Sequence, residues 1–166
     1  WPVAPPPAGP LSREGKELLD DDRPAEAVEL LRRAVAAAEP GAADLLARAY
    51  LDSGDWLGCI EWLAPHVARG HTEFAGRLGV AYVELGDLDN AEQALRLAVD
   101  SGEVVAANDL AILLRDTDRL AEALHVLRHA AEDGDEQAPA NLVALYLEAG
   151  FVEIGRAAAN AVSSLA

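Results

Sequence analysis

Apolar residues between positions 72 and 103 recur with the spacing of two amphipathic helices joined by a tight turn. On each helix the apolar positions lie three or four residues apart, which places them on one helical face. Gly86 and Asp87 interrupt this spacing and mark the turn. The defining positions are Leu78, Gly79 and Tyr82 on the first helix, Gly86 in the turn, and Ala91, Leu95 and Ala98 on the second helix.

The same pattern returns every 32 residues over nearly the whole chain, as from Ala91 to Ala123. The small position is Ala27, Cys59, Ala91, Ala123 and Gly155, and the large apolar position is Leu31, Leu63, Leu95 and Leu127, with Ala159 in the last copy. Two helices need a small residue where they approach closely and a large one where the groove between them is filled. The sequence therefore predicts an all-α fold, an α-solenoid of five antiparallel helix-turn-helix repeats with about ten helices and a 32-residue period.

These residue types at this spacing resemble the tetratricopeptide repeat, and the junctions before residues 76 and 139 also resemble the related Sel1-like repeat. Gly70, Gly102 and Gly134 recur at one phase, where a left-handed residue is expected to end each second helix. The resemblance implies a non-enzymatic scaffold for protein-protein interaction. In such proteins the first helices of the repeats line a concave groove that holds a peptide.

The predicted domain organisation is a Pro-rich linker over residues 1–10 and a repeat domain over residues 11–166. The prolines of the linker favour extended polyproline geometry. Alternatively, Trp1 and these prolines form a ligand for a proline-recognition domain. The predicted repeats cover about residues 11–39, 42–70, 72–102, 104–134 and 137–166.

Several positions depart from the repeat pattern. Glu14 replaces an expected leucine, which is typical of the polar outer surface of an N-terminal capping repeat. Pro65 predicts a kink or an early end of its helix. Trp56 and Trp62, in the same segment, either fill the volume that a kink opens or anchor a partner. The last predicted helix, Ile154 to Leu165, is so apolar that it either packs against further chain or self-associates.

Composition favours a protein partner over nucleic acid or a membrane. The chain has 29 acidic and 13 basic residues, hence a net charge of −16, which repels phosphate backbones and anionic lipid. Lysine occurs only as Lys16, so arginine dominates, as is typical of GC-rich bacterial genes. No signal-peptide pattern opens the sequence, and we expect a cytoplasmic protein. The single Cys59 occupies a small packing position and is expected to be a buried thiol.

One position is acidic in every repeat and is predicted to be exposed. It lies two residues beyond the Tyr82 position and therefore points away from the packed face. Lys16 and Arg48 lie four residues before the acids of the first two repeats and are expected to neutralise them. In the last three repeats that place is held by Val80, Ile112 and Ala144, which predicts uncompensated negative charge there. The acids are Asp20, Asp52, Glu84, Asp116 and Glu148.

The acidic position suggests a binding groove on the first helices of repeats three to five. By resemblance to tetratricopeptide proteins, Asn108 is the asparagine that bonds a peptide backbone in such grooves. The hypothesis is that the groove binds a basic, partly apolar segment; the alternatives are a merely solubilising acidic surface, or a regulatory or oligomerisation domain appended to an enzyme or transcription regulator. The predicted groove residues are Val80, Val83, Glu84, Asn108, Ile112, Asp116, Leu147 and Glu148.

The sequence offers little chemistry. His125 and His129 have a spacing that can hold a metal, with Glu122 or Glu132 as a third ligand, but the metalloprotease pattern is missing. No glycine-rich phosphate loop or catalytic triad can be traced. We therefore predict no enzyme, no catalytic residue, no metal site and no cofactor.

Overall fold

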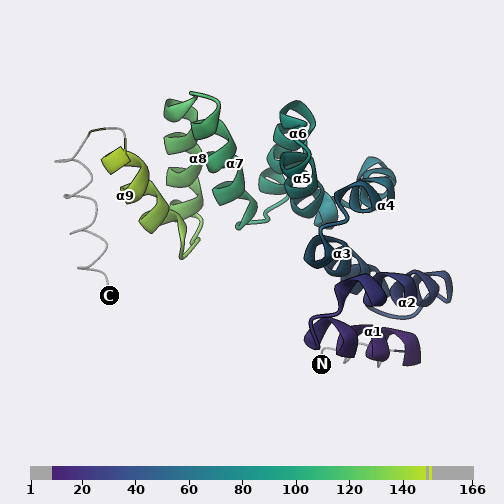
Figure 1. Cartoon of the computed structure of the whole chain (residues 1–166). Helices are drawn as coiled ribbons and strands as arrows, with labels where there is room; N and C mark the ends of the chain where they lie inside the picture. Colours follow the sequence, from purple (N-terminus) through teal and green to yellow (C-terminus); the bar gives the residue numbers. More distant parts are fainter. Residues whose placement is uncertain (1–8, 149, 151–166) are drawn as a thin grey trace, which may run out of the picture. The chain divides into compact units, whose positions relative to one another are not determined.

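The computed structural model describes residues 9–148 and residue 150, and these residues form α-helices and one short 3-10 helix, without any strand (Figure 1). The prediction of an all-α solenoid is confirmed. The last predicted helix, Ile154 to Leu165, and residues 1–8 of the predicted linker lie outside the described residues. The elements are α1 (Pro10–Asp20), α2 (Pro24–Ala36), α3 (Ala42–Ser53), α4 (Trp56–Ala68), η1 (Thr72–Phe74), α5 (Ala75–Glu84), α6 (Leu88–Asp100), α7 (Ala106–Asp116), α8 (Leu120–Glu132) and α9 (Ala138–Glu148).

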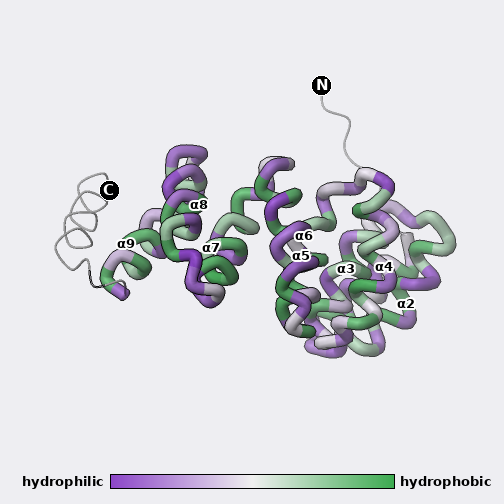
Figure 2. The backbone as a smooth tube through the Cα atoms, turned by 90° about the horizontal axis from the view of Figure 1, so that it is seen from above, coloured by the Kyte–Doolittle hydropathy of each residue, from purple (hydrophilic) through white to green (hydrophobic). Residues whose placement is uncertain are grey.

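The chain divides into two units, Trp1–Arg69 with α1 to α4 and Gly70–Ala166 with η1 and α5 to α9. Within each unit, helices that follow one another in the sequence pack together. Figure 2 shows apolar and polar stretches alternating along the helices. This alternation is what an amphipathic helix requires when it buries one face against its neighbours.

In the first and third hairpins the two helices approach very closely. A side chain on Gly79 would place its Cβ 2.6 Å from Leu95 Cγ, and one on Gly15 would place it 2.5 Å from Leu31 Cδ2. The small residues of the second helices are fully buried at Ala27, Cys59, Ala91 and Ala123. Both the predicted packing role of this position and the buried thiol of Cys59 are therefore confirmed.

The turns of the hairpins share one backbone conformation. The position of Gly86 has a positive φ in every described copy, and aspartate occupies it in two of them, at 58° in Asp22 and 60° in Asp118. Aspartate tolerates the left-handed region better than most side chains, which explains its alternation with glycine. The predicted glycines after the second helices are also left-handed, with φ of 97°, 90° and 94° at Gly70, Gly102 and Gly134.

A carboxylate after the second helix reaches back to the start of the first helix in three repeats. Glu39 Oε2 accepts a hydrogen bond from the backbone N–H of Ser12 at 2.7 Å, and Glu103 Oε2 accepts one from the N–H of Gly76 at 3.2 Å. In the fourth repeat, Asp135 Oδ2 accepts from Asn108 Nδ2 at 2.7 Å. Because helix N-termini carry unsatisfied N–H groups, the first two contacts act as remote caps.

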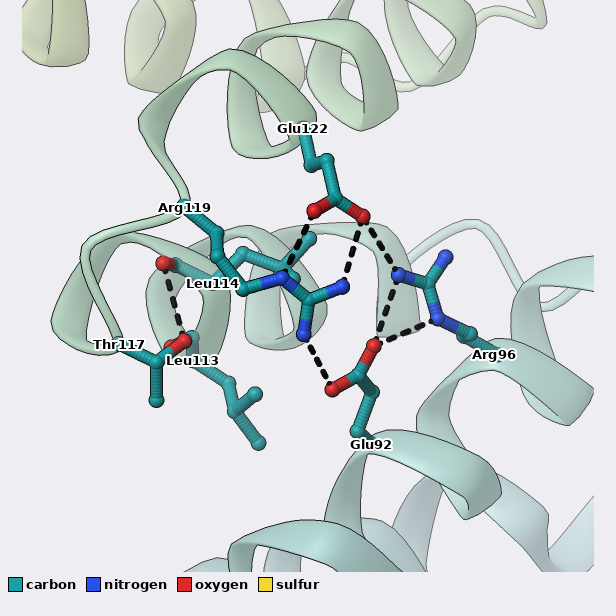
Figure 3. A network of polar contacts seen from close by, with 7 residues as sticks. All are labelled: Glu92, Arg96, Leu113, Leu114, Thr117, Arg119 and Glu122. Carbon is teal, nitrogen blue, oxygen red and sulfur yellow. Dashed lines mark hydrogen bonds and ion pairs between the residues drawn. The ribbon is translucent and has the colours of Figure 1, made fainter.

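Charged side chains tie α6 to the start of α8 (Figure 3). Arg119 Nη1 lies 2.6 Å from Glu92 Oε2, and Arg119 Nη2 lies 2.7 Å from Glu122 Oε2. Arg96 Nη2 lies 2.8 Å from Glu92 Oε1 and 3.0 Å from Glu122 Oε2. The hydrogen bond from Arg119 lowers the pKa of Glu92. Both arginines are therefore committed to this network.

Three details differ from or refine the predictions. Helix α4 runs through Pro65 to Ala68, so the predicted early end is wrong; the proline removes a single backbone donor in the last turn. Glu14 is exposed, as predicted for a capping surface. Both Trp56 and Trp62 are half-buried, and the Trp62 ring centroid lies 6.4 Å from that of Tyr50.

Ala38 is the alanine copy of the left-handed glycine position, with φ of 53°. Since glycine adopts this conformation without the Cβ penalty, Ala38→Gly should raise the free energy of unfolding by about 0.5–1 kcal/mol. Urea unfolding followed by circular dichroism measures the change. The matched control is Ala37→Gly, where φ is −83° and the substitution should destabilise the fold. Equal effects at both positions would contradict the prediction.

Gly79→Ala should lower the free energy of unfolding by about 1–2 kcal/mol, because the new methyl group overlaps Leu95. The free-energy cost of this overlap exceeds the gain from the higher helix propensity of alanine. In a Leu95→Ala background the same substitution has room and should become stabilising. Urea titration of the four proteins measures this reversal of sign. A Gly79→Ala penalty that persists without the Leu95 side chain would show that the close contact is not its cause.

Candidate functional site

Two neighbouring hollows lie along the first helices of the second unit. The α5–α7 hollow, of about 170 Å³, is lined by Val80, Val83, Glu84, Leu88, Asp109, Ile112, Leu113, Asp116 and Thr117. The α7–α9 hollow, of about 120 Å³, is lined by Asn108, Ala111, Ile112, Arg115, Leu127, Asn141, Ala144, Leu145 and Glu148. Ile112 belongs to both, and we call the two hollows together the groove. Seven of the eight predicted residues line it, whereas Leu147 lines neither hollow.

Large apolar side chains remain uncovered in the groove. Val83 is 37% exposed and Ile112 is 48% exposed, although both lie beside the buried core of their helices. Leu88, at the start of α6, is also exposed and extends the same apolar strip. Leu147 is 45% exposed on α9. An apolar strip of this kind, bordered by charges, is typical of surfaces that bind other proteins.

The α5–α7 hollow contains an acid that the sequence analysis missed. Asp109 is half-buried and lies with Glu84 and Asp116 among the lining residues. Burial raises the pKa of the Asp109 carboxyl. Asp109 precedes Ile112 by three residues and Asp116 by seven, which places all three on one helical face. That spacing could have identified it, but only positions acidic in every repeat were considered.

Arg115 changes the predicted distribution of charge. Its Nε lies 2.8 Å from Asp116 Oδ1, and its Nη1 lies 3.6 Å from Glu148 Oε2. The prediction that these two acids are uncompensated is therefore wrong. It considered only cations four residues earlier on the same helix, whereas Arg115 is adjacent to one acid and reaches the next repeat for the other.

The predicted compensation in the first two repeats is confirmed. Lys16 Nζ lies 2.6 Å from Asp20 Oδ2, and Arg48 Nε lies 3.0 Å from Asp52 Oδ2. Within the part of the chain that the structure describes, no side chain forms a hydrogen bond or ion pair with the carboxylates of Glu84 or Asp109. The unpaired negative charge of the groove is therefore concentrated in the α5–α7 hollow.

Asn108 is engaged within the chain. Its side chain is buried, with 6% of the residue exposed, and its Nδ2 donates to Asp135. Its Oδ1 accepts a hydrogen bond from Asn141 Nδ2 at 2.6 Å. Because these bonds join the α8–α9 loop and α9 to α7, Asn108 has a structural role that the sequence analysis did not foresee. Its contact with a peptide backbone stays a prediction.

The two candidate metal-binding histidines on α8 contact each other. The rings of His125 and His129 meet edge to face at a centroid distance of 4.8 Å. Glu122 is held by Arg119, and Glu132 Oε2 lies 3.8 Å from His129 Nδ1. No group of three or more potential ligands comes together among the described residues. None of the described helices is both long and apolar enough to cross a membrane.

Comparisons with known proteins agree with this architecture. Residues 72–101 and residues 104–133 each match the family described as tetratricopeptide repeat. No curated protein matches the chain.

Among solved structures, a thermophilic TPR protein of Thermus thermophilus is 23% identical, with 89% of this chain and 86% of that chain covered and a TM-score of 0.68. The nearly identical TPR-like repeats assigned to a kinesin light chain of Podosopora anserina are 18% identical, with 93% and 92% covered and a TM-score of 0.71. MamA from Desulfovibrio magneticus is 13% identical, with 96% and 97% covered and a TM-score of 0.73. At these identities the likeness concerns the fold.

The two family matches cover α5 to α8, where the close helix approach, the left-handed turns and the groove have just been described. The shared fold extends over most of the chain. Residues 72–101 and 104–133 are therefore repeats of the tetratricopeptide type, a class of scaffold for protein-protein interaction, and the chain shares the fold of such proteins.

Proposed function

We propose that the groove binds a basic, partly apolar segment of a partner protein, and that the α5–α7 hollow receives its cationic side chain. The observation that supports this most strongly is the half-buried carboxylate of Asp109, which has no described partner. An acid in such a place is costly to the folded protein unless a cation or donor reaches it. Functional sites are where costs of this kind accumulate.

The apolar part of the proposed partner contacts Val80, Val83 and Ile112. These three side chains border the same hollow as the acids, so one segment can bury them and neutralise the acids together. Full burial of a wholly exposed aliphatic side chain contributes about 1.5–3 kcal/mol, and Val83 and Ile112, which are 37% and 48% exposed, would contribute less than half of this each. A ligand that is only charged would leave this contribution unused.

Because of Arg115, the two hollows of the groove differ in charge. It supplies positive charge in the α7–α9 hollow and already pairs with Asp116 and Glu148. The described residues that line the α5–α7 hollow include Glu84 and Asp109 but no lysine or arginine. The basic side chain of the partner should therefore lie over α5 and α7, and its apolar or acidic neighbours should lie toward α9 and Leu147.

Selection of random twelve-residue peptides on the full chain should enrich sequences that combine arginine or lysine with large aliphatic residues. For a selected peptide, fluorescence anisotropy should show weaker binding to two variants, about two- to fivefold for Glu84→Gln and about tenfold for Asp109→Asn. The matched control is Glu14→Gln, which removes the same charge from an exposed position on α1. Enrichment of acidic peptides, or equal affinity in all three variants, would contradict the proposal.

Binding should also depend on pH through Asp109. Burial raises the pKa of this carboxyl in the unbound protein, and an adjacent bound cation should lower it. The affinity for the basic segment is then highest while Asp109 is ionised, and it decreases as the pH falls through the raised pKa. Isothermal titration calorimetry at decreasing pH measures this, with circular dichroism to verify folding. The Asp109→Asn variant should lose this part of the pH dependence; retention of the full dependence would refute the assignment.

A further inference from the structure

A second hollow lies between the second helices of the same unit, α6 and α8, and shares no lining residue with the groove. Its volume is about 600 Å³, larger than either hollow of the groove. Leu110 and Ala107 form a buried base, and Val99, Val104 and Val126 supply apolar walls. We call it the α6–α8 hollow. Its volume lies within the range of sites that bind a ligand or a side chain of a partner.

An equivalent hollow in the first two repeats can be compared with this one. Two periods earlier, a hollow of about 390 Å³ is lined by Arg32, Val35 and Leu46, which correspond to Arg96, Val99 and Leu110. A hollow thus occurs at the same place in two pairs of neighbouring repeats. Features present only in the later copy therefore need an explanation beyond the packing of the repeats.

The first difference between the two copies is volume. Trp62 borders the earlier hollow, where its ring lies near Tyr50, and Val126 holds the corresponding position in the later one. Replacing an indole by an isopropyl group removes most of the side chain that occupies the earlier hollow. The later hollow is consequently left open.

The second difference is charge. Asp100 stands where the first repeat has Ala36, and Asp133 stands where the second repeat has Arg69, whereas His125 stands where the second repeat has Glu61. Because Glu103 also lines the later hollow, its lining carries more acids than that of the earlier one. Asp100 ends α6 and Asp133 caps α8, so both acids add to the negative ends of the helix dipoles. Arg96 does not offset them, because Glu92 and Glu122 already hold it (Figure 3).

Exposed apolar residues continue beyond the hollow. Val104, on its border, is 39% exposed, and the next residue, Val105, is 64% exposed. A small cation would leave these side chains uncovered. A polypeptide that places one basic side chain between Asp100 and Asp133 can cover them at the same time.

We propose that the α6–α8 hollow is a second peptide-binding site, which receives an arginine or lysine side chain and an adjacent apolar side chain of a partner polypeptide. The edge-to-face rings of His125 and His129 border the cation, and Val126 leaves the space for it. The site is separate from the groove, so one chain can hold two segments at once. Two weak segments of one partner would then reinforce each other.

The test uses the dipeptide acetyl-leucyl-arginine amide as a probe of the full chain, followed by amide chemical shifts in NMR spectra. Shifts should appear at Gly102, Val104 and His129, and acetyl-leucyl-citrulline amide, which lacks the charge, should produce much smaller ones. Shifts around Val83 and Ile112 report the groove separately. The groove variant Glu84→Gln should reduce only those groove shifts.

Two variants test the hollow itself. Val126→Trp restores the residue type that borders the earlier hollow and should abolish the shifts of the α6–α8 hollow. Asp100→Ala combined with Asp133→Asn should weaken them about fivefold or more without adding bulk. The second variant keeps the test decisive if the first one disturbs folding.

Three results would overturn the proposal. They are the absence of shifts in the α6–α8 hollow at saturating probe, equal shifts with the citrulline peptide, and equal shifts with isobutylguanidine alone, which would indicate a site for small cations. Any of them leaves the groove shifts interpretable, so failure here is distinguishable from failure of the proposed function.

Discussion

The structure depends on the close approach of the two helices within a hairpin, which is tightest in the first and third hairpins. Gly79 lies against Leu95, and Gly15 lies against Leu31, at distances that leave no room for a Cβ atom. Since the leucine then fills the space between the helices, Leu31 and Leu95 are fully buried in the cores of their units. The chain must reverse its direction between the two helices without separating them. A turn residue such as Asp118 therefore adopts the left-handed backbone conformation.

The packed positions could be predicted from the sequence because each returns at the same phase with the same residue type. Ala91 and Leu95 need only periodicity and size to be assigned to the core. The course of α4 through Pro65 could not be predicted as well, since one missing donor in a last turn is tolerated when the surrounding packing persists. Local rules were least reliable where tertiary contacts compensate.

The groove was predictable in place but less so in chemistry. Helical spacing located Val83, Glu84 and Ile112, because it depends only on which face a residue occupies. The pairing of Arg115 with acids of two repeats depends on side-chain reach across helices, which a one-dimensional pattern does not contain. The engagement of Asn108 by Asp135 and Asn141 is of the same kind.

Residues that break the period carry most of the functional information in such a chain. Residues that obey it, such as Leu95, are explained by packing alone. Asp109 is not, because it is an acid at a position that holds Arg13, Leu45, Arg77 and Asn141 in the other copies; Val126 is smaller than Trp62, its counterpart two periods earlier. In an array of near copies, a substitution that opens space or leaves an acid unpaired destabilises its repeat, and the packing between repeats does not offset this loss of stability. Such departures therefore point to ligands, and they do so on two different helix faces of the same repeats.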